Sequence, residues 1–233
     1  MKVSIIIPTL NEEKTIVNVL NKVEAVDLGK IKKEIIVVDD KSTDRTWKLE
    51  KNQAGKHSNI KAIQRKSSIK GKSISIQEGL KHAKGDIIIV QDADLEYDPN
   101  DYSVLIKPIL EGNAKVVYGS RFLKKIWPDK MHLSNFLANK ILVFIANFLY
   151  NGNISDEATA YKVFKSDVLK KIKLKSIRFD FCPEVTAKVL KKGLKIYDVP
   201  ISYSARVKKE GKKVGLKDGL IAVWTLIKYR FID

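Results

Sequence analysis

The sequence predicts an α/β fold, in which helices flank a mostly parallel, Rossmann-like central sheet. Two observations predict it. Short runs rich in β-branched residues alternate with longer segments of helical periodicity through the first half of the chain. Four of the five short segments carry continuous apolar runs, as is typical of parallel strands buried on both faces. The repeated order of strand, helix and strand favours right-handed crossovers, and we expect one domain over residues 1–233.

The first half supplies five strands and four helices. We predict strands over residues 3–8, 34–38, 60–63, 86–91 and 115–118, and helices over 12–26, 43–54, 72–83 and 100–110. Asn11 is expected to be the N-cap of the first helix, because its side chain can accept a hydrogen bond from the first turn.

The second half is less regular. We predict an apolar helix over residues 133–150, a helix over 182–192 that Gly193 stops, a strand over 194–202 and an amphipathic helix over 217–230. The basic segment Arg206–Lys217 contains two glycines and is expected to be a loop before the last helix.

The composition is that of a folded, strongly basic chain. Lys and Arg number 44 against 27 Asp and Glu, which gives a net charge of +17. Such a field attracts nucleic acid, anionic membranes or phosphorylated substrates, and charge alone does not choose among them. The single Cys182 excludes an internal disulfide and favours a reducing compartment. The longest apolar stretch, 136–150, falls short of the roughly 20 residues of a membrane-spanning helix, so none is expected.

Acidic side chains follow several of the predicted strands. In open parallel sheets, ligands bind beyond the carboxyl ends of the strands. Asp92 and Asp94 flank one small residue at such an end, and this D-x-D spacing suits one Mg²⁺ or Mn²⁺ ion that also binds water and substrate phosphate. A solvated turn would account for the same spacing. The predicted proximity of Glu12, Asp39 and Asp40 favours a cation site, because clustered carboxylates repel one another.

Several motifs, in order, together resemble a known family. They are Pro8-Thr9-Leu10-Asn11-Glu12-Glu13, Val37-Val38-Asp39-Asp40 with Ser42 and Asp44, Gln91 to Pro99, Tyr118-Gly119-Ser120-Arg121-Phe122 and Asp156 to Lys162. From about residue 3 to residue 230 the chain is similar to family 2 glycosyltransferases. It most resembles the polyprenyl-phosphate branch, which includes the dolichol-phosphate mannose synthases. The resemblance implies the GT-A fold, with a nucleotide-sugar-binding half over 1–122 and an acceptor-binding half over 123–233.

The resemblance also implies roles for individual residues. Those implied to surround the base and ribose are Pro8, Leu10, Glu12, Val38, Asp39 and Asp40. Those implied to meet the diphosphate are Lys72, Asp92, Ala93, Asp94, Arg121, Arg206 and Lys212, with Asp92, Asp94 and a further ligand, Glu96, holding Mg²⁺ or Mn²⁺. Two positions depart from the family pattern: Leu10 stands where many relatives carry an aromatic residue, and Lys41 replaces a usual glycine.

The implied reaction is an inverting hexosyl transfer. The donor would be a GDP- or UDP-linked mannose or glucose, and the acceptor a polyprenyl phosphate such as dolichyl or undecaprenyl phosphate. Asp94 and Arg121 would stabilise charge on the leaving diphosphate. Asp156 would act as a positioning group or base, or else as the cap of a helix over 158–165. A strong base is unnecessary for a phosphate acceptor, which is already ionised.

A peripheral membrane location is a further expectation. The apolar helix over 133–150, the cationic surface and the terminal Trp224, Tyr229 and Arg230 suit contact with an anionic membrane on its cytoplasmic face. Ordinary packing of the helix against the sheet is the alternative.

Three other functions compete with this hypothesis. The same fold could transfer sugar to a soluble glycan or protein. Gly71-Lys72-Ser73 suggests a P-loop nucleotidase, but Lys66 stands where that motif requires glycine. A non-enzymatic nucleic-acid-binding domain would suit the charge, yet it lacks a recognisable motif and would place carboxylates against phosphate. No nucleic-acid partner is expected.

Overall fold

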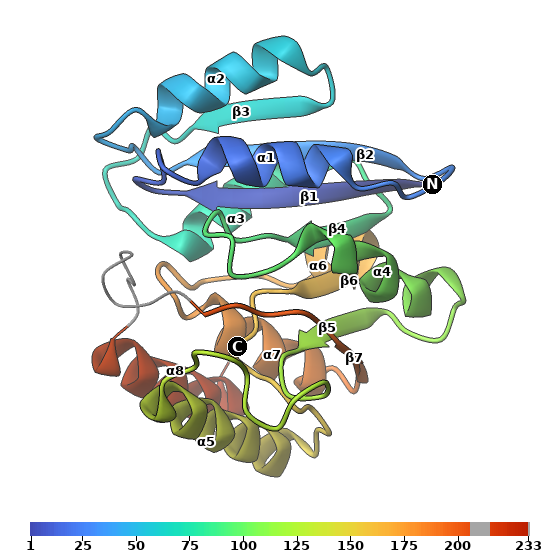
Figure 1. The fold of residues 1–233 in the computed structure, drawn as a ribbon. Helices are drawn as coiled ribbons and strands as arrows, with labels where there is room; N and C mark the ends of the chain where they lie inside the picture. Colours follow the sequence, from blue (N-terminus) through green and yellow to red (C-terminus); the bar gives the residue numbers. More distant parts are fainter. Residues whose placement is uncertain (206–214, 233) are drawn as a thin grey trace.

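The computed structural model describes residues 1–205 and 215–232, and its strands form one mixed sheet (Figure 1). The strands are β1 (Lys2–Thr9), β2 (Lys32–Asp39), β3 (Ile60–Gln64), β4 (Ile87–Val90), β5 (Val116–Ser120), β6 (Lys162–Lys165) and β7 (Ile196–Pro200), in the order β3-β2-β1-β4-β6-β5-β7. The β1–β2, β2–β3, β1–β4 and β5–β7 pairs are parallel. The predicted α/β fold with a mostly parallel sheet is therefore confirmed.

One strand, β6, runs against the others. It pairs antiparallel with both β4 and β5 and occupies residues for which a helix over 158–165 was one alternative. That alternative is wrong, and with it the helix-cap role for Asp156. Because β6 lies in the middle of the sheet, strands from both halves of the chain share one core.

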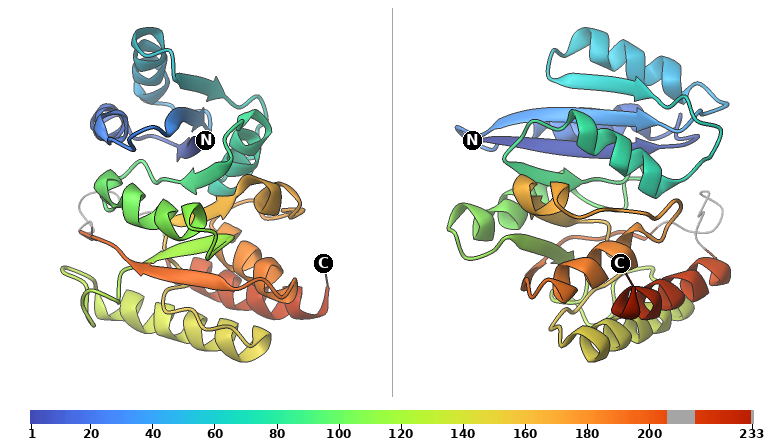
Figure 2. Two further views of the ribbon diagram at one scale, coloured as in Figure 1. Left: turned by 90° about the vertical axis from the view of Figure 1, so that its right-hand side faces the viewer. Right: turned by 180° about the vertical axis from the view of Figure 1, so that it is seen from behind.

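Two groups of helices cover the two faces of the sheet. The helices are α1 (Ile16–Ala25), α2 (Thr46–Lys56), α3 (Lys72–His82), the short 3₁₀ helix η1 (Pro99–Asp101), α4 (Tyr102–Leu110), α5 (Leu133–Tyr150), α6 (Ser166–Lys170), α7 (Phe181–Lys191) and α8 (Leu216–Phe231). Helices α1, α2 and α4 pack on one face, and α3, α6 and α7 pack on the other (Figure 2). Alternation along β1 sends Val3, Ile5 and Ile7 to the first face and Ile6 to the second.

Helices α5 and α8 form a further layer outside α7, held by a separate apolar cluster (Figure 1). Helix α5 has the predicted bounds. By length and composition it could cross a membrane, which differs from the sequence expectation, and only 17% of it is buried. The polar Asn139 and Asn147 point inward and bond to backbone groups of Ala158 and Ile154. Leu142 and Ala146 of α5 pack inward in that cluster, whereas Phe144, Phe148 and other large apolar side chains of the helix are exposed.

Helix α1 begins later than predicted. Its N-cap is Thr15, and Asn11 has left-handed backbone (φ 53°), so the expectation that Asn11 caps this helix is wrong. The side chain of Asn11 instead reaches across to the loop after β2, where its Oδ1 accepts a hydrogen bond from the Thr43 N–H at 2.8 Å. A contact with a distant loop has thus displaced the local cap.

Candidate active site

Three loops leave the carboxyl ends of β1, β2 and β4 side by side, because these strands are parallel neighbours. Each loop contains a residue with left-handed backbone: Asn11 (φ 53°), Lys41 (φ 57°) and Leu95 (φ 61°). Residues other than glycine adopt this conformation at a cost of about 1 kcal/mol or more. Backbone strain gathered at three neighbouring strand ends points to a functional edge. It also explains why glycine suits the position of Lys41.

The β1 and β2 loops are tied together by hydrogen bonds. The Asn11 N–H donates to Oγ of Ser42 at 2.9 Å, and the Glu12 N–H donates to Oγ1 of Thr46 at 2.8 Å. These contacts fix the segment after β1, a strand that ends in the buried residues Pro8 and Thr9. The predicted nucleotide-binding residues of the two strands are thereby held as one surface.

Asp39 is fully buried at the end of β2. Each of its carboxylate oxygens lies 3.2 Å from the Ser42 N–H, and Oδ2 accepts a second bond from Nε2 of Gln64 at 3.0 Å. Val38, the preceding residue, is buried in the core. Asp39 therefore shapes the turn after β2.

Asp40 fixes the start of α3. It forms an ion pair with the buried guanidinium of Arg65 and accepts a hydrogen bond from the Gly71 N–H at 2.5 Å. A side chain at residue 71 would not fit, because its Cβ would lie 2.1 Å from the carbonyl oxygen of Ile177. Nothing in the sequence marks Arg65 as part of the site, because in so basic a chain it looks like one more solvated cation.

Lys72, the first residue of α3, reaches the D-x-D motif. Its Nζ lies 2.5 Å from Oδ1 of Asp92, and each side chain is 19% exposed. Burial alone would lower the pKa of the Lys72 ammonium, but the carboxylates of Asp92 and Asp94 raise it overall. The ammonium of Lys72 thus lies against Asp92, one of the two carboxylates that the sequence predicts to bind a metal ion.

The carboxylates of Asp92 and Asp94 fit a divalent ion that takes part of its coordination from substrate. Oδ1 of Asp94 accepts a hydrogen bond from the Glu96 N–H at 3.2 Å, whereas Oε2 of Glu96 accepts one from the Tyr203 hydroxyl at 2.8 Å. Within residues 1–205 and 215–232, no three His, Cys, Asp or Glu side chains are grouped to hold a metal. Two hard carboxylates suffice for Mg²⁺ or Mn²⁺ when phosphate and water complete the shell.

Arg121 and Asp156 form a buried bidentate ion pair. Nε and Nη2 of Arg121 each lie 2.7 Å from a carboxylate oxygen of Asp156, and the Arg121 backbone N–H donates to the same carboxylate at 3.0 Å. Burial acts to lower the pKa of Arg121, but Asp156 raises it well above its usual value. Asp156 is fully buried, so it holds the guanidinium in place and offers no face to an acceptor.

Tyr203 links this pair to the D-x-D loop. Its ring lies 5.1 Å from the guanidinium carbon of Arg121, within the range of a cation–π contact, while its hydroxyl bonds Glu96. Residue 203 follows β7, far from both partners in sequence. No sequence signal marked it.

Two predicted phosphate-binding residues, Arg206 and Lys212, lie outside the described residues. The remaining predicted residues lie at the ends of β1 and β2, in the loops after β1, β2, β4 and β5, or at the start of α3, and Asp156 lies in the segment before the antiparallel β6, so all of them lie along one edge of the sheet.

A sequence model described as glycosyl transferase family 2 matches residues 4–173 of this chain. A dolichol-phosphate mannosyltransferase from Pyrococcus furiosus is 30% identical over 217 residues, which are 92% of this chain and 60% of that protein. The low-salt glycan biosynthesis hexosyltransferase Agl6 from Haloferax volcanii is 28% identical over 232 residues, or 99% of this chain and 53% of that protein. The chain thus spans between half and two thirds of these two relatives.

Solved structures show the same fold. Glucosyl-3-phosphoglycerate synthase from Mycobacterium tuberculosis, in complex with Mn²⁺, UDP and phosphoglyceric acid, superposes with a TM-score of 0.77 at 20% identity, over 100% of this chain and 79% of that one. Its complex with Mg²⁺ and UDP gives 0.76 at 19% identity, over 100% and 80%. These comparisons support the transferase hypothesis and give no support to a nucleic-acid-binding domain.

Proposed function

Because this chain belongs to glycosyl transferase family 2 and is a glycosyltransferase with a GT-A fold, we propose that it transfers mannose or glucose from a nucleotide diphosphate sugar to a polyprenyl phosphate. The observation that carries the proposal is the charge arrangement at the strand edge. The ammonium of Lys72 pairs with Asp92, and the charge of Asp94 also acts on it. This combination suits a metal–diphosphate group.

Asp92 and Asp94 would hold Mg²⁺ or Mn²⁺ together with donor phosphate oxygens. The bound ion would neutralise the charge that develops on the leaving nucleoside diphosphate. The metal ions in the similarly folded mycobacterial synthase support this assignment. Glu96 would contribute through the Asp94 loop, with its carboxylate oriented by Tyr203.

The nucleotide would bind along the tied β1 and β2 loops. Pro8, Leu10 and Glu12 would border the base from one side, and Val38 with Asp39 from the other. Asp40 would act through Gly71, whose position sets the start of α3 and so the reach of Lys72. Lys72 would then shift its ammonium between Asp92 and a diphosphate oxygen.

The acceptor phosphate supplies the nucleophile. One of its oxygens forms a bond to the anomeric carbon as the bond from that carbon to the diphosphate oxygen breaks, and the nucleoside diphosphate leaves with the electron pair. Because the second pKa of a phosphate monoester is about 6, the attacking oxygen needs no strong base near neutral pH. The burial of Asp156 agrees with this. Arg121, held by Asp156, would attract the anionic groups.

A polyprenyl acceptor requires access to lipid, and we propose that α5 and α8 contact an anionic membrane on its cytoplasmic face. The exposed apolar side chains of the two helices are Leu133, Leu137, Ile141, Phe144 and Phe148 on α5 and Leu220, Ile221, Trp224 and Phe231 on α8. Exposed Lys124, Lys125 and Lys130 lie in the loop before α5, and Arg230 is exposed near the end of α8. Apolar side chains with flanking cations suit an anionic bilayer surface.

A donor screen tests the proposed reaction. The chain is incubated with GDP- or UDP-linked mannose or glucose, Mn²⁺ or Mg²⁺ and a polyprenyl phosphate, and both released nucleotide and glycosylated lipid are measured. We expect turnover that EDTA and Asp94→Asn each reduce by about a hundredfold or more. Asp129→Asn, at an exposed surface carboxylate, is the matched control and should keep full turnover.

Three results would contradict the proposal. Full turnover in EDTA, or full turnover of Asp94→Asn, would remove the metal assignment. Turnover with a soluble glycan or protein acceptor, and none with polyprenyl phosphate, would show that the acceptor is not a lipid phosphate.

A further inference from the structure

Helix α3 takes the partners of its first turn from a distant part of the chain. Its N-cap residue is a glycine, which has no side chain to accept hydrogen bonds from the first N–H groups. Instead, the Ser73 N–H donates to the carbonyl oxygen of Arg178 at 2.9 Å, and the Ile74 N–H donates to that of Ile177 at 3.3 Å. Both carbonyl groups belong to the connecting segment, residues 171–180, which joins α6 to α7. This segment therefore closes the start of α3.

Two side-chain contacts of Ser176 strengthen this junction. The hydroxyl oxygens of Ser73 and Ser176 lie 2.7 Å apart, and both residues are buried. Nε2 of Gln77, one turn further along α3, donates to the carbonyl oxygen of Ser176 at 2.8 Å. A buried polar group that loses its partner is costly, so these bonds hold the helix and the segment in one relative position.

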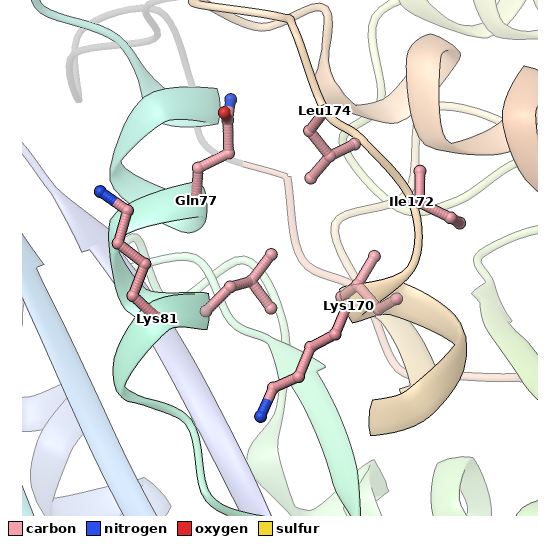
Figure 3. Close-up of a pocket in the computed structure, with 7 residues that line it drawn as sticks. Gln77, Lys81, Lys170, Ile172 and Leu174 are labelled. Carbon is pink, nitrogen blue, oxygen red and sulfur yellow. The ribbon is translucent and has the colours of Figure 1, made fainter.

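A hollow separates α3 from an earlier part of the connecting segment. Figure 3 shows this hollow, of about 430 Å³, with Gln77 and Lys81 of α3 on one side and Ile172 and Leu174 of the segment on the other. Lys81 pairs with Glu78 of its own helix at 2.7 Å. Because the hollow lies between these side chains, the placement of α3 against the segment depends more on the hydrogen bonds at the start of the helix.

Glu184 holds the connecting segment from the side of α7. Its side chain is fully buried, Oε1 accepts the Lys175 N–H at 2.7 Å, and Oε2 accepts the Ser176 N–H at 2.8 Å. Oε1 also accepts a hydrogen bond from Nζ of Lys188 at 2.6 Å. Burial acts to raise the pKa of Glu184, but Lys188 and Ser176 lower it overall. The carboxylate is therefore ionised, and hydrogen bonds to a charged acceptor are the stronger kind.

We propose that Glu184 and Ser176 are positioning residues of the donor site, which hold Lys72 at the D-x-D motif. The path is continuous: Glu184 bonds the backbone of Ser176, and Ser176 bonds α3. The first residue of that helix is Lys72, whose Nζ lies 2.5 Å from Oδ1 of Asp92. This role rests on the proposed function, which gives Lys72 the task of binding a donor diphosphate oxygen. Neither positioning residue touches the substrate.

A positioning role and a purely structural role predict different kinetics. Contacts that only stabilise the fold lower the free energy of unfolding when they are lost, but they leave the kinetic constants of the folded enzyme unchanged. Lys72 would bind the donor in the ground state and in the transition state alike, so its displacement raises the donor KM and leaves kcat unchanged. The acceptor KM would not change either, because Lys72 meets the donor.

The test variant, Ser176→Ala/Gln77→Leu, removes both side-chain contacts between the connecting segment and α3. The matched control, Ser4→Ala/Gln53→Leu, makes the same substitutions at two other hydrogen-bonded side chains, near the amino-terminal end of β1 and on α2. Hydrogen exchange, followed by mass spectrometry without donor or metal, reports on the first turn of α3. We expect exchange there to be about fivefold faster in the test variant and within about twofold of the wild type in the control.

Steady-state kinetics with a nucleotide sugar and polyprenyl phosphate supply the second readout. We expect the donor KM of the test variant to rise about fivefold, while its kcat and acceptor KM stay within about twofold of the wild type. The control should keep all three constants within about twofold of the wild type.

Glu184→Gln tests the contact from the side of α7, because glutamine keeps the size of the side chain and removes its charge. We expect it to speed exchange at the start of α3 as well, but to add little when combined with Ser176→Ala/Gln77→Leu, since both act through the same contact. Effects that simply multiply would show that Glu184 acts independently of Ser176 and would overturn its role. If Glu184→Gln does not fold, Ser176→Ala/Gln77→Leu decides the proposal by itself.

Unchanged exchange in Ser176→Ala/Gln77→Leu, or an equal increase in the control, would overturn the proposal. Faster exchange at the start of α3 with an unchanged donor KM would do the same, because the contact would then be structural only. Exchange requires no donor, so a wild type that turns over no nucleotide sugar would contradict the proposed function, while exchange would still decide whether Ser176 fixes the start of α3.

Discussion

Glu50 is a buried carboxyl group whose ordinary chemistry is altered by its surroundings. Its side chain is fully buried on α2, and neither oxygen has a hydrogen-bond partner of ordinary geometry among the described residues. Burial, together with the charges of Asp39 and Asp44, raises its pKa to about 8. Nothing in the sequence indicates this burial, because a glutamate between Lys48 and Lys51 on a helix is expected to be solvent-exposed.

The raised pKa of Glu50 predicts a stability that falls with pH. The unfolded chain loses this proton near the ordinary pKa of about 4.5, whereas the folded chain keeps it up to about 8. The protonated Glu50 therefore contributes its full share to the free energy of unfolding below pH 4.5. This contribution is lost progressively as the pH rises to 8 and changes no further above that. We expect Glu50→Gln to gain on the order of a few kcal/mol relative to the wild type across this window.

Urea unfolding of both proteins at several pH values from 4.5 to 8.5 measures this difference. Glu78→Gln, at a partly exposed carboxylate of α3, controls for the loss of one negative charge. If the difference in unfolding free energy between the wild type and Glu50→Gln stayed constant across this pH window, Glu50 would have to be ionised in the folded state.

Substitution of Asp156 tests whether this residue positions Arg121 or acts as a catalytic base. Asp156→Asn leaves the Arg121 guanidinium buried without its countercharge, and breaking one side of a buried ion pair costs about 3–5 kcal/mol. We expect lower stability and a fall in kcat, while the pH profile of kcat/KM keeps its shape. Disappearance of an acidic limb from that profile would instead identify Asp156 as the base.

Among individual residues, the carboxylates at the strand edge could be predicted from the sequence, but the side chains that pair with them could not. Asp39, Asp40, Asp92 and Asp94 follow apolar runs, so their shared edge could be inferred from strand direction alone. Their partners come from distant parts of the chain, and a pattern of local residues carries no such information. Even Arg121 and Asp156, both within recognisable motifs, gave no sign that each is the other's partner.

At the scale of elements, buried periodic segments were predicted well and their ends less so. The helix over 133–150 has the predicted bounds, and the five strands of the first half lie within two residues of prediction at each end. The strand β6 was missed because it is short and begins with Lys162. That lysine is fully buried, with its Nζ bonded to the Glu157 carbonyl oxygen at 2.6 Å and 3.8 Å from the Tyr118 ring. Only the folded chain reveals such partners.

The start of α3 offers a test of how one element positions the site. Gly71→Ala would force its Cβ against the Ile177 carbonyl oxygen, displacing the start of α3 and with it Lys72. We expect a loss of about 1–3 kcal/mol in stability and a higher KM for the donor. The matched control is Gly55→Ala on α2, where a Cβ meets nothing within 4 Å, and which should gain about 0.5–1 kcal/mol.

Chemical denaturation measures the stability of both variants, and kinetics at varied donor concentration measure their KM. If Gly71→Ala were as stable as Gly55→Ala and kept the wild-type KM, then the packing of α3 against residue 177 would not position Lys72.

At the scale of the whole molecule, composition predicted an anionic partner but not the surface that meets it. The net charge of +17 is compatible with nucleic acid, membrane or phosphate. The orientation of α5 adds what composition lacks, because this helix buries Asn139 and exposes Phe144 and Phe148, whose rings stack at 6.0 Å. A helix pattern shows how many apolar residues lie on one side, but only packing shows which side faces the protein.

The proposed membrane contact of α5 can be tested on the intact chain. We expect Phe144→Asp/Phe148→Asp to co-sediment with phosphatidylglycerol-containing vesicles at least about tenfold more weakly than the wild type, because charged residues cannot enter the apolar layer. Lys48→Ala/Lys56→Ala changes the net charge equally on an exposed face of α2 and should lose little binding. Since both phenylalanines are exposed, thermal unfolding of the variant should match the wild type. Equal loss of binding in the two variants would show that vesicle binding depends on net charge alone and that α5 does not contact the membrane.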